Sequence, residues 1–158
     1  MEMNRNLNPC FLLFSPCTDG FAGRLIEMLG ASFPGFGLEV FLRQEDMRKR
    51  LCDPKQNIIS AILVAPSPSD LRRAEVLQPM LEDIPIVILL GEGDAEGIAA
   101  AHRFHPRFLT YFDEDGESII KVLRQLALKK EAYRYGFQFE VPAVKMDRWS
   151  SESFPRKG

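Results

Sequence analysis

The stretch "IPIVILL" (residues 84–90) is the purest apolar run in the chain. A short continuous run of this kind, without polar alternation, is typical of a strand buried on both faces of a parallel sheet. "IISAILVA" (58–65) and "CFLLF" (10–14) have the same character. "LEVFLR" (38–43) and "RFLTYF" (107–112) are expected to complete a set of five strands.

A helical pattern follows each predicted strand. Thr18 or Asp19 can cap the first helix, and Ser69 or Asp70 the third. Strands that alternate with helices require right-handed crossovers and a parallel sheet covered on both faces. We therefore predict an α/β fold: a flavodoxin-like, doubly wound sheet of five parallel strands in a three-layer sandwich. The expected helices are residues 19–33, 44–53, 71–83, 95–104 and 113–137.

Composition limits the function classes. The 158 residues are 46% hydrophobic and 27% charged with a net charge of −2, so a bulk basic field for nucleic acid is absent. No apolar run approaches the length of a membrane helix, and the first ten residues lack a signal-peptide core, so we expect a cytoplasmic protein. Three cysteines without a CxxC argue against disulfides or a zinc site. His102 and His105 lack an obvious third ligand, and no cofactor is expected.

The loop after the first strand, "SPCTDG" (15–20), could bind a ligand because such loops lie at the carboxyl edge of the sheet. Cys17, Thr18, Asp19 and Gly20 form "CTDG", which loosely resembles the loop of phosphocysteine carriers in sugar phosphotransferase systems. A helix N-terminus would activate a cysteine there. A structural cysteine is the plainer interpretation. Flavin binding is disfavoured because the neighbouring loops lack aromatic residues.

Residues 9–130 resemble the receiver domain of bacterial response regulators, the CheY-like family. The stretch that carries the resemblance is "IPIVILLGEGDAEGIAAAHRFHPRFLTYFDEDGESIIKVLRQL" (84–126). It includes the small-residue helix "GIAAAH" and the aromatic and leucine-rich strand "RFLTYF" of that family. The resemblance implies a signalling domain, and its working residues can be located by position.

The resemblance places the family's phosphorylation apparatus on residues that cannot perform it. The acidic pair that holds the metal falls on Ser15 and Pro16. The phosphoacceptor aspartate falls on Ala65, or on Pro66 if the register slips by one. The Ser/Thr that binds the phosphoryl group falls on Leu90, and the lysine falls on Tyr111. We therefore expect a degenerate, non-enzymatic pseudo-receiver that acts without phosphorylation.

Two nearby carboxylates leave an alternative open. Asp19 and Asp70 each lie several residues beyond a predicted strand end. Either could take over a metal or phosphoacceptor role if the loop brought it back over the sheet edge.

Receivers signal through the face formed by their fourth helix, fifth strand and fifth helix, often by dimerising there. The resemblance assigns Phe104, Arg107, Phe108, Lys121 and Arg124 to this face, with Phe108 where receivers carry an aromatic switch residue. We therefore expect protein partners and a homodimer. Basic residues that could pair with acids across a dimer are Arg103, Arg107, Arg124, Lys129 and Lys130.

The chain divides into a tail (1–8), the receiver-like domain (9–130) and an aromatic extension (131–158) that is expected to be partly disordered. Within the extension, "FQFEVPAV" (137–144) alternates and could add a strand to a sheet edge. The extension could also link the domain to an output domain beyond the C-terminus.

Overall fold

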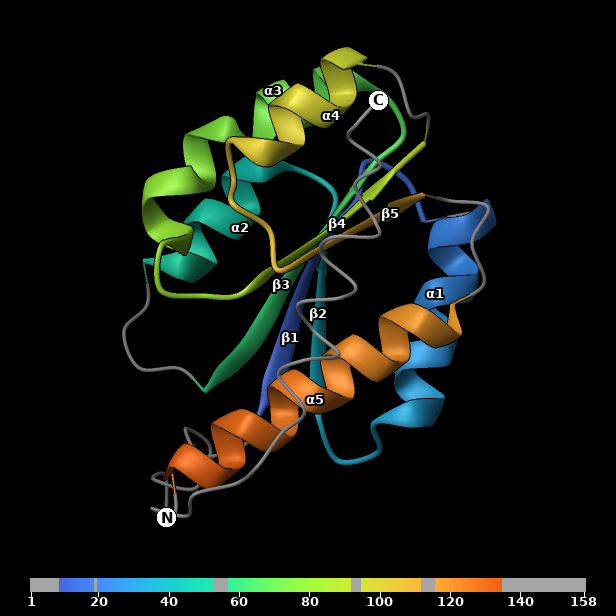
Figure 1. Ribbon diagram of the computed structural model, residues 1–158, viewed down its shortest axis with the longest axis vertical. Coiled ribbons are helices and arrows are strands. Elements are labelled where there is room, and N and C mark those ends of the chain that lie inside the picture. The colour runs from blue at the N-terminus through green and yellow to red at the C-terminus, as the bar shows by residue number, and fades with distance from the viewer. Residues whose placement is uncertain (1–8, 19, 53–56, 92–94, 112–115, 135–158) are drawn as a thin grey trace.

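The computed structural model describes residues 9–18, 20–52, 57–91, 95–111 and 116–134. Strands and helices alternate along these ranges (Figure 1). The strands are β1 (Cys10–Phe14), β2 (Gly37–Phe41), β3 (Ile58–Ala65), β4 (Ile86–Leu90) and β5 (Phe108–Tyr111). The helices are α1 (Gly20–Ser32), α2 (Gln44–Leu51), α3 (Pro68–Ala74), the 3-10 helix η2 (Glu75–Leu81), α4 (Ala95–His102) and α5 (Glu117–Arg134).

The five strands form one sheet in the order β2-β1-β3-β4-β5, and every pairing is parallel. This order is that of the flavodoxin-like doubly wound fold, so the predicted fold class is confirmed. Figure 1 shows α1 and α5 on one face of the sheet and α2, α3 and α4 on the other, which makes three layers. The chain changes direction between β1 and β3, and there the carboxyl ends of the strands form the expected ligand edge.

The core has two halves because side chains of a strand alternate between the faces of the sheet. In β1, Leu12 and Phe14 belong to the apolar cluster under α2, α3 and α4. Phe11 and Leu13 belong to the cluster under α1 and α5. Every residue of β3 is buried, as the unbroken apolar sequence of a central parallel strand predicts. Each fully buried leucine or phenylalanine contributes about 1.5–3 kcal/mol of hydrophobic free energy.

The third helix differs from the prediction at both ends. It begins at Pro68 with Ser67 as N-cap, so capping by Ser69 or Asp70 was wrong. Pro68 suits the first helical position, where its missing N–H leaves no bond unmade. The α-helical pattern stops at Ala74 and continues as η2, which contains Pro79. Proline removes an i to i−4 hydrogen bond, and the 3-10 geometry accommodates that loss.

Helix α5 continues through Arg134, past the predicted domain boundary at residue 130. The rest of the predicted aromatic extension, residues 135–158, and the predicted tail, residues 1–8, lie outside the described residues. Among the helices that the structure describes, none combines the length and the apolar character that crossing a membrane requires.

Candidate functional site

The strand ends bring the predicted pocket residues together at the carboxyl edge of the sheet. Ala65, the last residue of β3, is the register partner of Leu90 in β4. Leu90 is in turn the partner of Tyr111, the last residue of β5. Ser15 and Pro16 directly follow β1, which pairs with β3. The residues that the sequence assigned to one site therefore lie along one edge.

The last residues of β3, β4 and β5 make an apolar part of this edge. Ala65 and Leu90 are each 2% exposed and belong to one hydrophobic cluster with Phe14, and Tyr111 packs against the same cluster. A methyl group and an isobutyl group offer neither a phosphoacceptor nor a hydrogen bond to a phosphoryl group. The arrangement stabilises the fold at the positions that the receiver resemblance assigned to phosphorylation.

Ser15 carries a polar group at this edge, but its hydroxyl is used locally. The side chain is fully buried. Its Oγ donates to the carbonyl oxygen of Cys17 at 2.5 Å and accepts from the Cys17 N–H at 3.4 Å. The Ser15 N–H donates to the Phe41 carbonyl oxygen at 3.0 Å. Ser15 therefore shapes the turn after β1, as short hydroxyl side chains often do, and it supplies no carboxylate for a metal.

Asp70 is committed to the start of α3. Its Oδ2 accepts hydrogen bonds from the N–H and the hydroxyl of Ser67, both at 3.0 Å, and its Oδ1 lies 3.5 Å from the Arg73 guanidinium. A carboxylate at the third helical position that reaches back to the N-cap is half of a capping box. Its partners in the structure favour a structural role for Asp70 over the metal or phosphoacceptor role.

The loops that follow β3 and β4 are in close contact at this edge of the sheet. The Gly91 N–H donates to the Ala65 carbonyl oxygen at 2.9 Å, which extends the β3–β4 pairing by one residue. A Cβ atom on Gly91 would lie 2.4 Å from the Pro66 carbonyl oxygen and 2.9 Å from its Cα. Glycine is therefore required at residue 91 for this close approach of the two loops.

The predicted ligand loop around Cys17 is exposed. Cys17, Thr18 and Gly20 are all at the surface, and α1 begins at Gly20, whose φ of 64° suits glycine. Asp19 lies outside the described residues. Among the residues that the structure describes, no group of three or more His, Cys, Asp and Glu side chains could hold a metal ion, and His102 and His105 join no such group. Phosphate or phosphocysteine chemistry at this loop stays a prediction.

The three cysteines should differ sharply in reactivity, since all are free thiols but only Cys10 is buried. Burial raises the pKa of the Cys10 thiol, although the Arg50 guanidinium 3.8 Å from its sulfur opposes that rise. We expect Ellman's reagent at pH near 8 to label Cys17 and Cys52 rapidly and Cys10 only with unfolding. The Cys17→Ser variant should lose one fast thiol. Labelling of all three thiols in one phase would contradict the buried position of Cys10.

The predicted interaction face is only partly at the surface. Phe104 and Phe108 are 3% and 5% exposed and belong to opposite halves of the core, so neither offers side-chain surface in this structure. Arg107 and Lys121 are exposed. Arg124 is exposed as well, but its guanidinium lies over the Phe33 ring at 5.6 Å, next to the end of α1. It therefore lies beside the end of α1, and its assignment to the interaction face stays a prediction.

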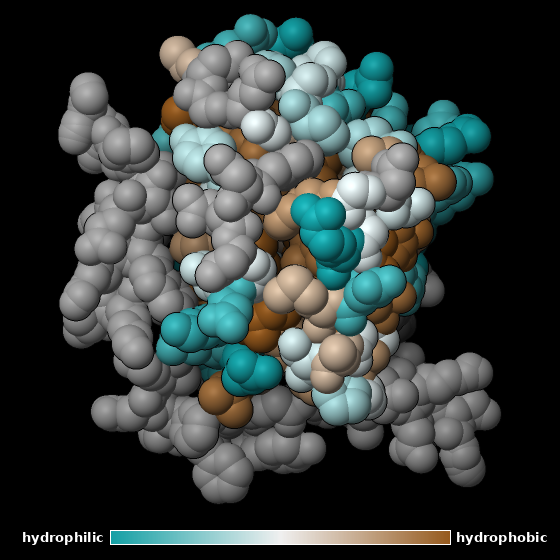
Figure 2. All heavy atoms as spheres, turned by 90° about the vertical axis from the view of Figure 1, so that its right-hand side faces the viewer, coloured by the Kyte–Doolittle hydropathy of each residue, from teal (hydrophilic) through white to brown (hydrophobic). Residues whose placement is uncertain are grey.

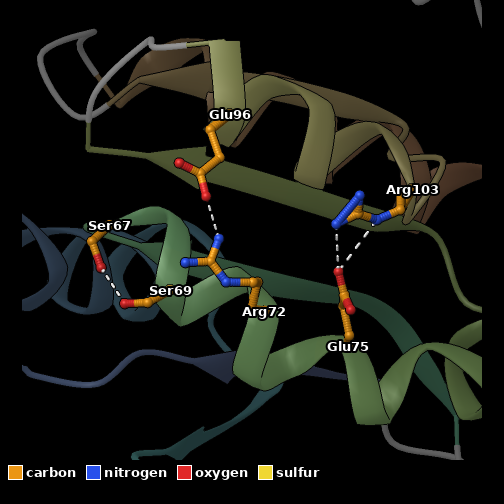
Figure 3. Close-up of polar contacts among 6 residues, drawn as sticks. All are labelled: Ser67, Ser69, Arg72, Glu75, Glu96 and Arg103. Carbon is orange, nitrogen blue, oxygen red and sulfur yellow. Dashed lines mark hydrogen bonds and ion pairs between the residues drawn. The ribbon is translucent and has the colours of Figure 1, made fainter.

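Ion pairs within the chain hold α4 against the preceding helices (Figure 3). Arg103 contacts Glu75 at 2.9 Å, and Arg72 of α3 contacts Glu96 of α4. The Gln78 amide also donates to the Arg103 carbonyl oxygen at 2.6 Å. Arg103 was predicted as a residue that could pair across a dimer, but its guanidinium is already engaged. These contacts connect Glu96, near the start of α4, and Arg103, just after its end, to the preceding helices.

The outer surface of α5 shows an apolar residue that sequence reasoning missed. Leu128 is 46% exposed. It lies one helical turn after Arg124 and two turns after Lys121, so the three share one side of the helix. The sequence carried a signal, since Leu128 falls outside the phase of the buried α5 residues. Figure 2, which views the molecule from the right-hand side of Figure 1, where α1 lies, shows apolar residues exposed between polar ones.

Comparisons with known proteins support the fold. No protein-family model and no curated protein matches the chain. A crystal structure of a response regulator protein from Burkholderia pseudomallei, with a phosphorylated aspartic acid, a calcium ion and citrate, is similar with a TM-score of 0.55. The identity is 17%, over 80% of this chain and 73% of that one. The chain therefore has the fold of a response regulator receiver domain.

Proposed function

We propose that this protein is a phosphorylation-independent, receiver-like signalling domain that acts by binding other proteins and is not an enzyme. The observation that carries the proposal is the apolar carboxyl edge, where Ala65, Leu90 and Tyr111 lie side by side. The similar Burkholderia protein contains a phosphorylated aspartic acid and a calcium ion. In this chain Ala65 ends β3 and packs in an apolar cluster with Phe14 and Leu90.

The first test is the response to a phosphoryl mimic. We expect the amide NMR spectrum to stay unchanged when Mg²⁺ and beryllofluoride are added at millimolar concentrations, because neither ion finds carboxylate ligands. A receiver domain with an intact aspartate serves as the positive control. Saturable shifts near residues 15–19 and 65–70 would contradict the proposal and would assign the lost role to Asp19 or Asp70.

We further propose that α5 supplies the contact surface of a homodimer. Leu128 is an exposed apolar residue flanked on its own side of the helix by two cations. An apolar centre with a charged surround is the usual composition of a protein–protein interface. Because Arg103 is paired inside the chain, the exposed cations Lys121 and Arg124 shift the expected contact from α4 toward α5.

Reversing two charges tests this surface. We expect Lys121→Glu/Arg124→Glu to raise the dimer Kd at least about tenfold in sedimentation equilibrium, since like charges would then oppose the partner's acids. The matched control is Arg48→Glu/Lys49→Glu, which changes the net charge equally on the exposed side of α2. A monomeric wild type at about 100 μM protein, or equal effects of the two variants, would rule out the α5 homodimer.

A further inference from the structure

A cavity lies at the amino edge of the sheet, opposite the edge where receivers carry their chemistry. Its volume is about 380 Å³, which is within the range of small-molecule sites. The walls come from the starts of β3, β4 and β5 and from the later turns of α5. None of the residues assigned to phosphorylation or to the Cys17 loop takes part.

The floor of the cavity is apolar and the rim is basic. Ile59 and Leu126 are 1% and 4% exposed, and Pro85 completes the apolar surface. Arg107, Lys129 and Lys130 supply three cations. Asp83 is the acidic residue among those that line the cavity, so the lining carries a net positive charge.

An interaction with the helix dipole does not account for the positions of Lys129 and Lys130. Cations near a helix C-terminus interact favourably with the helix dipole, but that effect is confined to the last turn. Helix α5 ends at Arg134, so Lys129 and Lys130 lie before its last turn. The Lys130 ammonium donates to the Ile58 carbonyl oxygen at 3.2 Å, which holds it at the cavity wall. An ammonium has three donors, so two remain for a ligand.

The Arg107 side chain is available as well. Its backbone is fixed, because the Arg107 N–H donates to the Ile86 carbonyl oxygen at 2.7 Å at the start of β5. The guanidinium is exposed and takes part in none of the ion pairs among the described residues, unlike Arg50, Arg72 and Arg103. A guanidinium binds carboxylate and phosphate groups with two parallel hydrogen bonds.

We propose that this cavity binds a small amphipathic organic anion, with its carboxylate or phosphate on Arg107 and Lys129 and its apolar body on Ile59 and Leu126. Apolar walls with a few converging polar groups are the usual composition of a ligand site. Partial desolvation strengthens each charged contact relative to one in bulk water. The proposal is independent of the homodimer, because Lys121 and Arg124 do not line the cavity.

The test uses 1-naphthoate and 1-naphthyl phosphate as probes, followed by calorimetry and by amide NMR of the full chain. We expect saturable binding of at least one probe, with shifts around Ile59, Leu126 and Lys130. The probe that binds more tightly identifies the head group that the cavity prefers. Neutral 1-naphthylmethanol and inorganic phosphate should each bind at least about tenfold more weakly, since each keeps only half of the contacts.

Variants assign the binding to this cavity. Arg107→Gln/Lys129→Gln should weaken the probe at least about tenfold and reduce its salt dependence, and Lys121→Gln on the same helix should change nothing. Both changed residues are exposed, so the spectrum away from the cavity should be preserved. Lys129→Gln alone provides a second, smaller step. The proposal is overturned if neither probe binds saturably or if the neutral alcohol binds as tightly as the charged probes. It is also overturned if Lys121→Gln weakens binding as much as the double variant does.

Discussion

Ala65→Asp places a carboxylate where the receiver resemblance puts the phosphoacceptor, and it is expected to lower the free energy of unfolding by about 3–5 kcal/mol at neutral pH. Ala65 is 2% exposed, and the described residues around it form an apolar cluster that includes Phe14 and Leu90. A carboxylate placed there has no cation among those neighbours to offset its lost hydration. Urea unfolding of the variant and the wild type measures the difference.

The drop in the free energy of unfolding caused by Ala65→Asp should depend on pH in a defined direction. Desolvation raises the pKa of a buried carboxyl, so the folded state holds its proton more tightly than the unfolded chain does. The variant should therefore recover stability as pH falls below the folded-state pKa. The recovery is about 1.4 kcal/mol for each pH unit until the unfolded value of about 3.9 is reached. Ala65→Asn is the matched control, since it has nearly the same shape and its loss should not change with pH.

The same variant tests whether the chain lacks only the aspartate or also the other residues that phosphorylation requires. Because Ser15 and Pro16 supply no metal ligands and Tyr111 supplies no ammonium, Ala65→Asp should still not respond to Mg²⁺ and beryllofluoride. A variant as stable as the wild type that takes up the mimic would show that the rest of the apparatus is intact. The proposed independence of phosphorylation would then depend on residue 65 alone.

The strands could be predicted from the sequence because their apolar runs are continuous and separated by helical segments. Their ends were predicted well enough to locate Ala65, Leu90 and Tyr111 side by side. The start of α3 was not, because Ser67 and Ser69 are equally good N-caps by residue type. The bonds of Asp70 to Ser67 decide between them, and these form only once the turn has folded.

Features that depend on tertiary packing could not be predicted from the sequence, for a different reason. Whether Phe104 and Phe108 are exposed depends on which element packs over them, and Arg124 is placed by the ring of Phe33, which follows α1. The amino-edge cavity joins positions from residue 59 to residue 130, and no spacing in the sequence brings those positions together. Local patterns define the elements, whereas surfaces shared by distant elements require the packed structure.

Gly91→Ala is expected to destabilise the fold by about 1–3 kcal/mol, near the upper end of that range. The added Cβ would lie 2.4 Å from the Pro66 carbonyl oxygen and 3.0 Å from its carbonyl carbon. These are backbone atoms at the end of β3, so relief requires the β3 and β4 ends to separate and the Gly91–Ala65 hydrogen bond to lengthen. Chemical denaturation and amide exchange at Gly91 follow the two effects.

The matched control is Gly30→Ala, an identical change inside α1 where no atom lies within 4 Å of the added Cβ. There the substitution should raise stability by about 0.5–1 kcal/mol, because alanine loses less backbone entropy than glycine in a helix. If the two substitutions change stability in opposite directions, the effect at Gly91 comes from the close contact between the two loops. A general effect of alanine would change stability in the same direction at both glycines. If Gly91→Ala were neutral, the loops could separate at little cost, and the edge between β3 and β4 would be open to a ligand after all.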